Sequence, residues 1–285
     1  MRHQSPPHLG ARVTGFDRRR WMLGVAASVA ASGLRAQTFD QGHAAWTALL
    51  RKHVAPLRGG QASQVRYAGF KADRAALQAY RDSLSAVSEA AFKAFSKSQQ
   101  MAFLINAYNA STVELILTKY PGLASIKDLG SVFGSPWKPK WIQLLGGKVS
   151  LDDIEQGMLR ERGRFDDPRV HFGVNCASIG CPPLREEAFV AERLDGQLDE
   201  QALRFMSDRT RNRFDAAAGR LEVSKIFDWY GGDFSPGHGG IASLQAFMSR
   251  YADSLADSQV DRERVRGQHT EISFLPYDWK LNDAA

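Results

Sequence analysis

The sequence predicts an α+β protein with a single domain over residues 37–285, in which helices pack on a small, mostly antiparallel sheet. Several segments repeat apolar residues every three to four positions, and others repeat them every second position. Hydrophobic residues make up 44% of the 285 residues and aromatic residues 10%, which is enough for a sizeable core. The sequence contains no internal repeat, coiled-coil heptad or low-complexity linker that would divide this domain.

The first part of the domain predicts helices with one short strand among them. Residues 37–60 repeat apolar side chains at helical spacing and then reach a Gly-Gly break, and residues 64–68 predict a strand. Residues 73–95 predict two helices that are separated near residues 85–88.

The strongest helix signal covers residues 98–120. Ser96 and Gln99 resemble a capping box before it, and a Pro-Gly pair ends it. The helix carries Asn106 and Asn109 in an otherwise apolar stretch, although Asn competes for backbone hydrogen bonds and is a poor helix-interior residue. Two explanations stay open: the amides hydrogen-bond a neighbouring loop, or they belong to a polar cluster that lines a binding site.

A hairpin and a polar strand follow this helix. Residues 142–149 predict a β-hairpin that turns at a Gly-Gly pair, and the next run, Ser-Leu-Asp-Asp, caps a short helix that carries Glu155. In residues 170–175, apolar side chains alternate with His171, a glycine and Asn175, which is the period of a strand. This alternation predicts His171 and Asn175 on one face of the strand, about 13 Å apart.

The remaining residues continue the same mixture of elements. Residues 186–206 predict a helix, residues 220–224 a strand and residues 241–255 another helix. Between the last two lies an aromatic and acidic turn region, residues 226–234.

The positive charge of the chain comes from its N-terminus. The formal net charge is +6, but six of the 37 basic residues and one of the 31 acidic residues lie in residues 1–36, so the rest carries a net charge of +1. This remainder contains no long basic stripe, so we expect no nucleic-acid partner.

Residues 1–36 resemble a twin-arginine export signal. Arginines 18 to 20 precede an apolar run of about 14 residues, which is too short to span a bilayer comfortably. Small residues then lead to a predicted cleavage after Ala36. We therefore expect a periplasmic or secreted protein without a stable membrane span after cleavage. The alternative is an uncleaved amphipathic anchor.

Both cysteines, Cys176 and Cys181, lie in one loop after the predicted strand. A structural disulfide is the first interpretation, because the cysteine count is even and the protein is expected to be exported. A nucleophilic Cys176 thiol is the second, for which His171 would have to lower the pKa of the thiol. Asn175 or Glu155 would then orient the imidazole.

Other kinds of site have less support in the sequence. A zinc site formed by the two cysteines, His171 and Asp228 would have a spacing that no standard zinc motif uses. The sequence contains no phosphate-binding glycine-rich loop, no H-E-x-x-H and no G-x-S-x-G. We therefore predict neither a metal nor a cofactor.

Several separated motifs together resemble the domain of unknown function 547 (DUF547) family. They are A-F-L-I-N-A-Y-N-A at 102–110, S-L-D-D-I-E at 150–155, the run 171–182, F-D-W-Y at 227–230 and Y-D-W-K-L-N at 277–282. They occur in the expected order, and the resemblance covers most of residues 46–282. The family supplies no established activity, but the resemblance implies a recurring polar set: Asn106, Tyr108, Asn109, Glu155, His171, Asn175, Cys176, Ser178 and Cys181.

A more remote comparison is with papain-like and transglutaminase-like folds, in which a nucleophile opens a buried helix and a histidine lies on a following strand. The helix of Asn106 and Asn109 precedes the His171 segment in the same order, but it carries Asn where such a fold has its cysteine. Any cysteine chemistry would therefore have moved to Cys176.

Two functional hypotheses follow from these residues. The first is a hydrolase or acyl-transferase that uses a histidine with either a thiol or an activated water molecule. The residues assigned to catalysis are His171, Cys176, Asn175 and Glu155, and those assigned to ligand binding are Asn106, Asn109, Tyr108 and Ser178. The second is a non-catalytic periplasmic binding protein, with a Cys176–Cys181 disulfide, that recognises a small polar or peptide ligand.

Overall fold

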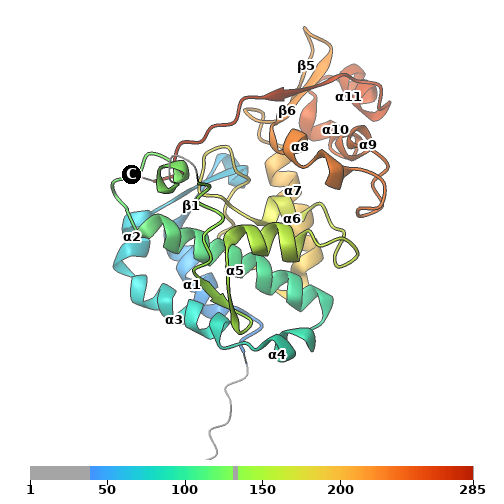
Figure 1. Cartoon of the computed structure of the whole chain (residues 1–285). Helices are drawn as coiled ribbons and strands as arrows, with labels where there is room; N and C mark the ends of the chain where they lie inside the picture. The colour runs from blue at the N-terminus through green and yellow to red at the C-terminus, as the bar shows by residue number, and fades with distance from the viewer. Residues whose placement is uncertain (1–38, 131–133, 285) are drawn as a thin grey trace, which may run out of the picture. The chain divides into compact units, whose positions relative to one another are not determined.

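The computed structural model describes residues 39–130 and 134–284. The chain from Phe39 onward forms one compact unit of helices and short strands, as Figure 1 shows, so the α+β prediction is confirmed. The predicted export signal, residues 1–36, lies outside the described residues.

The first five helices include the longest one, α5. They are α1 (Ala44–His53), α2 (Tyr67–Ala72), α3 (Arg74–Ser85), α4 (Glu89–Lys93) and α5 (Lys97–Leu117). The predicted capping box is present, because Ser96 accepts a hydrogen bond from the Gln99 N–H and Gln99 accepts one from the Ser96 N–H. Helix α5 packs against α2 and α3, as Figure 1 shows, and every residue from Met101 to Glu114 is buried.

In the described residues, seven short strands form three separate sheets rather than one. β1 (Val54–Leu57) pairs with β2 (Ala62–Val65), β3 (Ile142–Leu144) with β4 (Gly147–Val149), and β6 (Arg220–Ser224) with β5 (Arg213–Asp215) and β7 (Ile272–Leu275). All pairs are antiparallel except β6 with β7. The predicted hairpin at 142–149 and the predicted strand at 220–224 are confirmed.

The other described elements are short helices and helical turns. They are η1 (Arg58–Gly60), η2 (Ile126–Leu129), η3 (Asp153–Leu159), α6 (Val170–Gly173), η4 (Ala191–Arg193), α7 (Leu194–Met206), α8 (Ile226–Trp229), η5 (Gly231–Phe234), α9 (Leu244–Ser249), α10 (Ala252–Leu255) and α11 (Gln259–Arg266). The π-helical turn η3 begins at the predicted cap, where Ser150 and Asp153 exchange hydrogen bonds. The helix predicted at 186–206 begins only at η4, and the helix predicted at 241–255 is divided into α9 and α10.

The strand predicted at residues 170–175 is wrong, because this segment forms the short helix α6. The Phe172 N–H donates to the Arg169 carbonyl, and the Val174 N–H donates to the Val170 carbonyl. Val170 and Val174 pack in one hydrophobic cluster, whereas Phe172 packs in a second one. The alternation of apolar residues therefore reflects a helical turn that contributes to two clusters, and the predicted 13 Å spacing along a strand does not apply.

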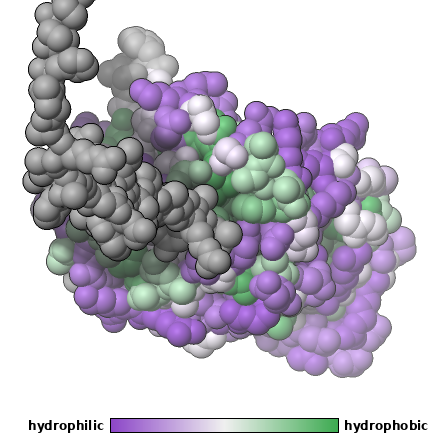
Figure 2. Space-filling view, turned by 90° about the horizontal axis from the view of Figure 1, so that it is seen from below, coloured by the Kyte–Doolittle hydropathy of each residue, from purple (hydrophilic) through white to green (hydrophobic). Residues whose placement is uncertain are grey.

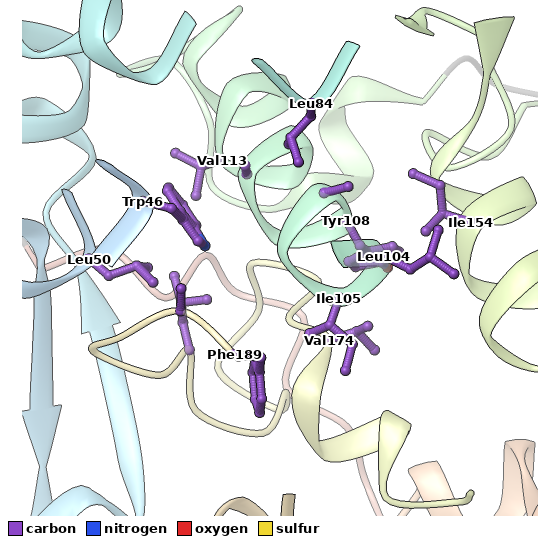
Figure 3. Close-up of a cluster of buried hydrophobic side chains, with 14 of the residues drawn as sticks. Trp46, Leu50, Leu84, Leu104, Ile105, Tyr108, Val113, Ile154, Val174 and Phe189 are labelled. Atoms are coloured by element: carbon purple, nitrogen blue, oxygen red, sulfur yellow. The ribbon is translucent and has the colours of Figure 1, made fainter. Parts of the chain in front are cut away.

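These two clusters form the core of the compact unit. Figure 3 shows part of the larger cluster, to which α5 contributes Ile105 and other segments contribute Trp46, Val174 and Phe189. The smaller cluster contains buried aromatic and aliphatic side chains from α6 to α11, with Phe172 as the contribution of α6. Helix α6 thus links the two clusters and carries His171 between them.

The face drawn in Figure 2 is mostly polar. Purple hydrophilic residues surround smaller green apolar patches there. Among the helices of residues 39–130 and 134–284, none is long and apolar enough to cross a membrane.

Candidate active site

A cleft with a volume of about 200 Å³ lies where α5, η3, α6, α8 and the C-terminal segment meet. Both cysteines line it, together with Tyr108, Glu155 and His171, and all five belong to the predicted polar set. Two other hollows are larger, at about 390 and 410 Å³, but neither is lined by a predicted site residue. The chemistry of the lining, rather than its size, therefore identifies this cleft as the candidate site.

His171 on α6 is held by a carboxylate that the sequence analysis did not identify. Its Nε2 lies 2.8 Å from Oδ2 of Asp233 in η5. An ionised carboxylate only accepts hydrogen bonds, so we assign the proton to Nε2, which leaves Nδ1 as the basic nitrogen of the neutral ring. The ring of Tyr230 stacks on the imidazole with 4.1 Å between the centroids and 28° between the planes. The imidazole therefore has one fixed orientation.

Arg160, which follows η3, holds the same carboxylate by a two-point contact. Its Nε donates to Oδ2 of Asp233 at 2.5 Å, and its Nη2 donates to Oδ1 at 3.0 Å. Burial by itself would raise the pKa of Asp233, but the hydrogen bonds from His171 and Arg160 outweigh burial and lower this pKa. Asp233 is therefore ionised at neutral pH and remains an acceptor for the imidazole.

Glu155 of η3 is the second carboxylate of the cleft, and only 7% of this residue is exposed. Its Oε1 accepts a hydrogen bond of 2.7 Å from the hydroxyl of Tyr230. Burial and the negative charge of Glu155 raise the pKa of Tyr230, so this hydroxyl stays protonated and continues to donate. Burial and then Glu155 raise the pKa of Tyr108 in the same way. Tyr230 thus contacts His171 with its ring and Glu155 with its hydroxyl.

One wall of the cleft is aromatic, and its side chains come from three separate segments. Between ring centroids, Trp279 lies 4.5 Å from Tyr277, 5.5 Å from Trp229 and 6.0 Å from Trp137. Trp229 is 44% exposed although it is large and apolar. We call Trp137, Trp229, Tyr277 and Trp279 the aromatic wall, which offers flat apolar faces to a ligand.

Cys176 and Cys181 form a disulfide with their Cα atoms 6.3 Å apart, which confirms the first interpretation of the pair. Neither sulfur is a thiol in this oxidised form, so neither can act as a nucleophile or as a thiolate ligand of zinc. Asp228, the fourth ligand of the zinc interpretation, pairs with Lys225 at 2.6 Å. Within residues 39–130 and 134–284, no group of His, Cys, Asp and Glu side chains has the arrangement of a metal site.

Hydrogen bonds hold the disulfide loop in place. The Asn175 side chain donates to the Pro182 carbonyl at 2.8 Å, and the hydroxyls of Ser178 and Tyr277 lie 2.9 Å apart. A Cβ atom at Gly180 would lie 2.8 Å from the ring of Tyr277, so a larger residue there would displace the aromatic wall. The loop therefore positions Tyr277 as well as the two sulfurs.

The two helix asparagines bind neighbouring backbone, as one of the two open explanations expects. Asn109 donates to the Gly173 carbonyl and accepts from the Asn175 N–H, both at 2.8 Å. Asn106 forms the same pair of bonds with the backbone of Phe189, at 2.7 and 3.1 Å. Asn109 thus contacts the segment that carries His171, but neither amide lines the cleft.

The structure divides the predicted polar set into two groups. Tyr108, Glu155, His171, Cys176 and Cys181 line the cleft, whereas Asn106, Asn109, Asn175 and Ser178 lie behind it. The hydrogen-bond partner of the imidazole is Asp233, rather than the Asn175 or Glu155 named under the thiol interpretation.

Sequence reasoning missed Asp233, Tyr230 and Arg160. Two weak signals were available. Tyr230 lies in the F-D-W-Y motif, and Asp233 is one of two acidic residues in the aromatic turn region at 226–234, which has no motif spacing to His171. Arg160 follows η3, and no sequence pattern links it to a site.

Comparison with known proteins adds one finding. Residues 92–206 match the family model described as protein of unknown function, DUF547. No curated protein and no solved structure matches the chain, so the papain-like and transglutaminase-like comparison gains no support. The matched residues include α5, His171 and both cysteines, but they end before Tyr230 and Asp233. The central segment of this chain, residues 92–206, is therefore similar to the DUF547 family of proteins of unknown function.

Proposed function

We propose that the protein is a hydrolase in which His171 activates a water molecule for attack on an ester or amide carbonyl. One observation carries this proposal: Nε2 of His171 is held 2.8 Å from Asp233, and the ring lines a cleft. Within the described residues, no group hydrogen-bonds to Nδ1. A fixed ring with one nitrogen left for a substrate or water is the arrangement that a general base requires.

The proposed steps balance in protons. Nδ1 takes a proton from water as the water oxygen attacks the carbonyl, and the ionised Asp233 stabilises the imidazolium that forms. The same proton then passes to the leaving alcohol or amine when the tetrahedral intermediate collapses. Arg160 supports both steps because it keeps the pKa of Asp233 low. An acyl-transferase would use the same steps with an alcohol or amine in place of water.

The identity of the nucleophile is tested with a panel of p-nitrophenyl esters and aminoacyl p-nitroanilides. If water attacks, the Cys176→Ser/Cys181→Ser double variant should keep its kcat/KM within about threefold of the parent, with or without dithiothreitol. A rate that appears only with dithiothreitol and disappears in the double variant would contradict the water mechanism and favour the Cys176 thiol.

A non-catalytic binding protein is the second candidate, and the aromatic wall favours it. Large exposed aromatic faces such as Trp229 are typical of ligand-binding surfaces and are not required by the chemistry of His171. This candidate predicts quenching of tryptophan fluorescence by compounds that the protein does not convert. Product formation that depends on His171 would exclude it.

We also propose that the protein is exported to the periplasm or secreted. The twin-arginine-like run in residues 1–36 and the Cys176–Cys181 disulfide support this location, because disulfides persist in oxidising compartments. Replacing Arg18, Arg19 and Arg20 together with Lys should leave an unprocessed precursor in the cytoplasm. Export at the normal level would exclude the twin-arginine route.

A further inference from the structure

The described lining of the cleft contains acidic side chains but no permanently charged cation. Asp152 and Glu155 are among the lining residues, and no lysine or arginine of residues 39–130 and 134–284 lines the cleft. Arg160 lies close to it, but its guanidinium is already paired with both oxygens of Asp233. A ligand therefore meets two carboxylates that no cation of the lining neutralises.

Asp152 differs from its neighbour in the same helical turn. Asp153 accepts the Ser150 N–H at 2.9 Å and pairs with Lys140 at 3.2 Å. Asp152 is half-buried, and its N–H donates to the Trp137 carbonyl at 3.0 Å, but its carboxylate forms no ion pair or hydrogen bond with the described residues. A half-buried carboxylate that has lost part of its hydration is stabilised by a bound positive charge.

The aromatic wall also favours binding of a positive charge. The faces of Trp and Tyr rings carry partial negative charge and attract organic cations. Trp279 already forms such a contact, because Nζ of Lys127 lies 3.8 Å from the centroid of its ring. Trp229 and Tyr277, which pack against Trp279, also line the cleft.

We propose that the cleft binds an organic cation, an alkylammonium or guanidinium group on a short apolar chain, between Asp152 and the aromatic wall. The reaction itself rests on the proposed hydrolase function. Under that function, the substrate is a cationic ester or amide whose scissile carbonyl faces His171. The carboxylate supplies charge attraction, and the aromatic faces bind the apolar chain and the delocalised charge.

The proposal predicts that charge decides affinity when shape is kept constant. Arginine and citrulline side chains have nearly the same shape, but only arginine is charged. We expect Nα-acetyl-arginine methylamide to bind at least about tenfold more tightly than Nα-acetyl-citrulline methylamide, which is the contribution of one cation–π and ion-pair contact in a partly desolvated site. The preference should weaken as the salt concentration rises.

The experiment measures both dissociation constants by tryptophan fluorescence and calorimetry. It uses the whole mature protein carrying His171→Gln, which prevents turnover during the titration. Adding Asp152→Asn should reduce the arginine preference to about threefold or less and leave the citrulline affinity unchanged. Asp228→Asn is the matched control, because it removes the same charge from a residue that pairs with Lys225 and does not line the cleft.

Equal binding of the arginine and citrulline compounds, or tighter binding of neutral methyl glucoside, would overturn the cation site, as would failure of the arginine compound to bind. The same would hold if Asp228→Asn weakened arginine binding as much as Asp152→Asn.

Turnover separates this proposal from the hydrolase proposal. Selective binding by a wild-type protein that cleaves no arginine ester rejects only the hydrolase, whereas His171-dependent cleavage of arginine and citrulline esters at equal kcat/KM rejects only the cation site.

Discussion

Two polar regions of the same core use their hydrogen-bonding groups in opposite ways. Behind the cleft, the amides of Asn106, Asn109 and Asn175 bind backbone groups of neighbouring segments. In the cleft, His171 hydrogen-bonds the side chain of Asp233, and Glu155 accepts a hydrogen bond from the hydroxyl of Tyr230. Both side chains line the cavity. The first region holds segments together, and the second presents reactive groups to a ligand.

This difference has a simple chemical origin. An amide carries a donor and an acceptor, so a single Asn satisfies both groups of a passing backbone segment without introducing charge. A buried ionisable group needs a charged or strongly polar partner, and here that partner comes from a distant part of the chain. The kind of hydrogen-bond partner therefore distinguishes a structural cluster from a candidate site. Polar residues of the structural cluster bind backbone groups, whereas those of the candidate site bind side chains and face the cleft.

The largest expected effect tests the reactive region. Under the proposed hydrolase mechanism, His171→Gln should lower kcat/KM for any cleaved ester by about 10²–10⁴-fold, because the general base is lost. The amide of Gln replaces one hydrogen bond to Asp233, so the free energy of unfolding should change by about 1 kcal/mol or less. Steady-state kinetics and urea denaturation measure the two quantities. Unchanged activity with a lowered melting temperature would show that His171 is structural. The contrast between a structural region and a reactive region would then be wrong.

The opposite pattern is expected for the structural region. Asn109→Ala leaves the Gly173 carbonyl and the Asn175 N–H without buried partners, and each unpaired group costs roughly 1–3 kcal/mol. The free energy of unfolding should therefore fall by about 2–6 kcal/mol, while kcat/KM at a temperature well below the transition changes less than about threefold. Asn106→Ala is the matched control with the same bond pattern at Phe189. A selective loss of activity at full stability would show that the helix amides belong to the site.

Asp233 holds the candidate general base His171 and also contributes to the stability of the fold. The pH dependence of the stability tests the second role. Its folded-state pKa is lowered, below an unfolded value of about 4, so the ionised carboxylate contributes stability at neutral pH. That contribution is lost as the pH falls from about 4 toward the folded pKa. Asp233→Asn should therefore destabilise the protein by about 1–3 kcal/mol at pH 7, with a smaller difference from the parent below pH 4. Chemical denaturation at several pH values tests this, and a constant difference would contradict it.

The smallest expected effect concerns Ser178, which the sequence assigned to ligand binding. Its hydroxyl lies 2.9 Å from the hydroxyl of Tyr277 and 3.0 Å from Sγ of Cys176, so it belongs to the disulfide loop. Ser178→Ala should lower the free energy of unfolding by about 1 kcal/mol and change the dissociation constant of a cleft ligand less than about threefold. Fluorescence titration beside thermal melting measures both. A tenfold weaker affinity would move Ser178 into the reactive region.

The sequence by itself determined the elements whose signals are local. The helix at 98–120 was predicted because Ser96 and Gln99 form a capping box and because the apolar period is long. The hairpin at 142–149 was marked by its Gly-Gly turn, and the Cys176–Cys181 disulfide by an even cysteine count with an expected exported location. Residue types also indicated His171 and Glu155, which both line the cleft.

The tertiary structure alone decided how residues 170–173 fold and which carboxylate binds His171. A four-residue segment has no stable helix of its own, and its apolar period is compatible with either a strand or a turn between two clusters. The bond from His171 to Asp233 joins residues 62 positions apart, so no local pattern predicts it. Only the packing of the second hydrophobic cluster, which buries Phe234 beside Asp233 and Phe172 beside His171, brings these two side chains together.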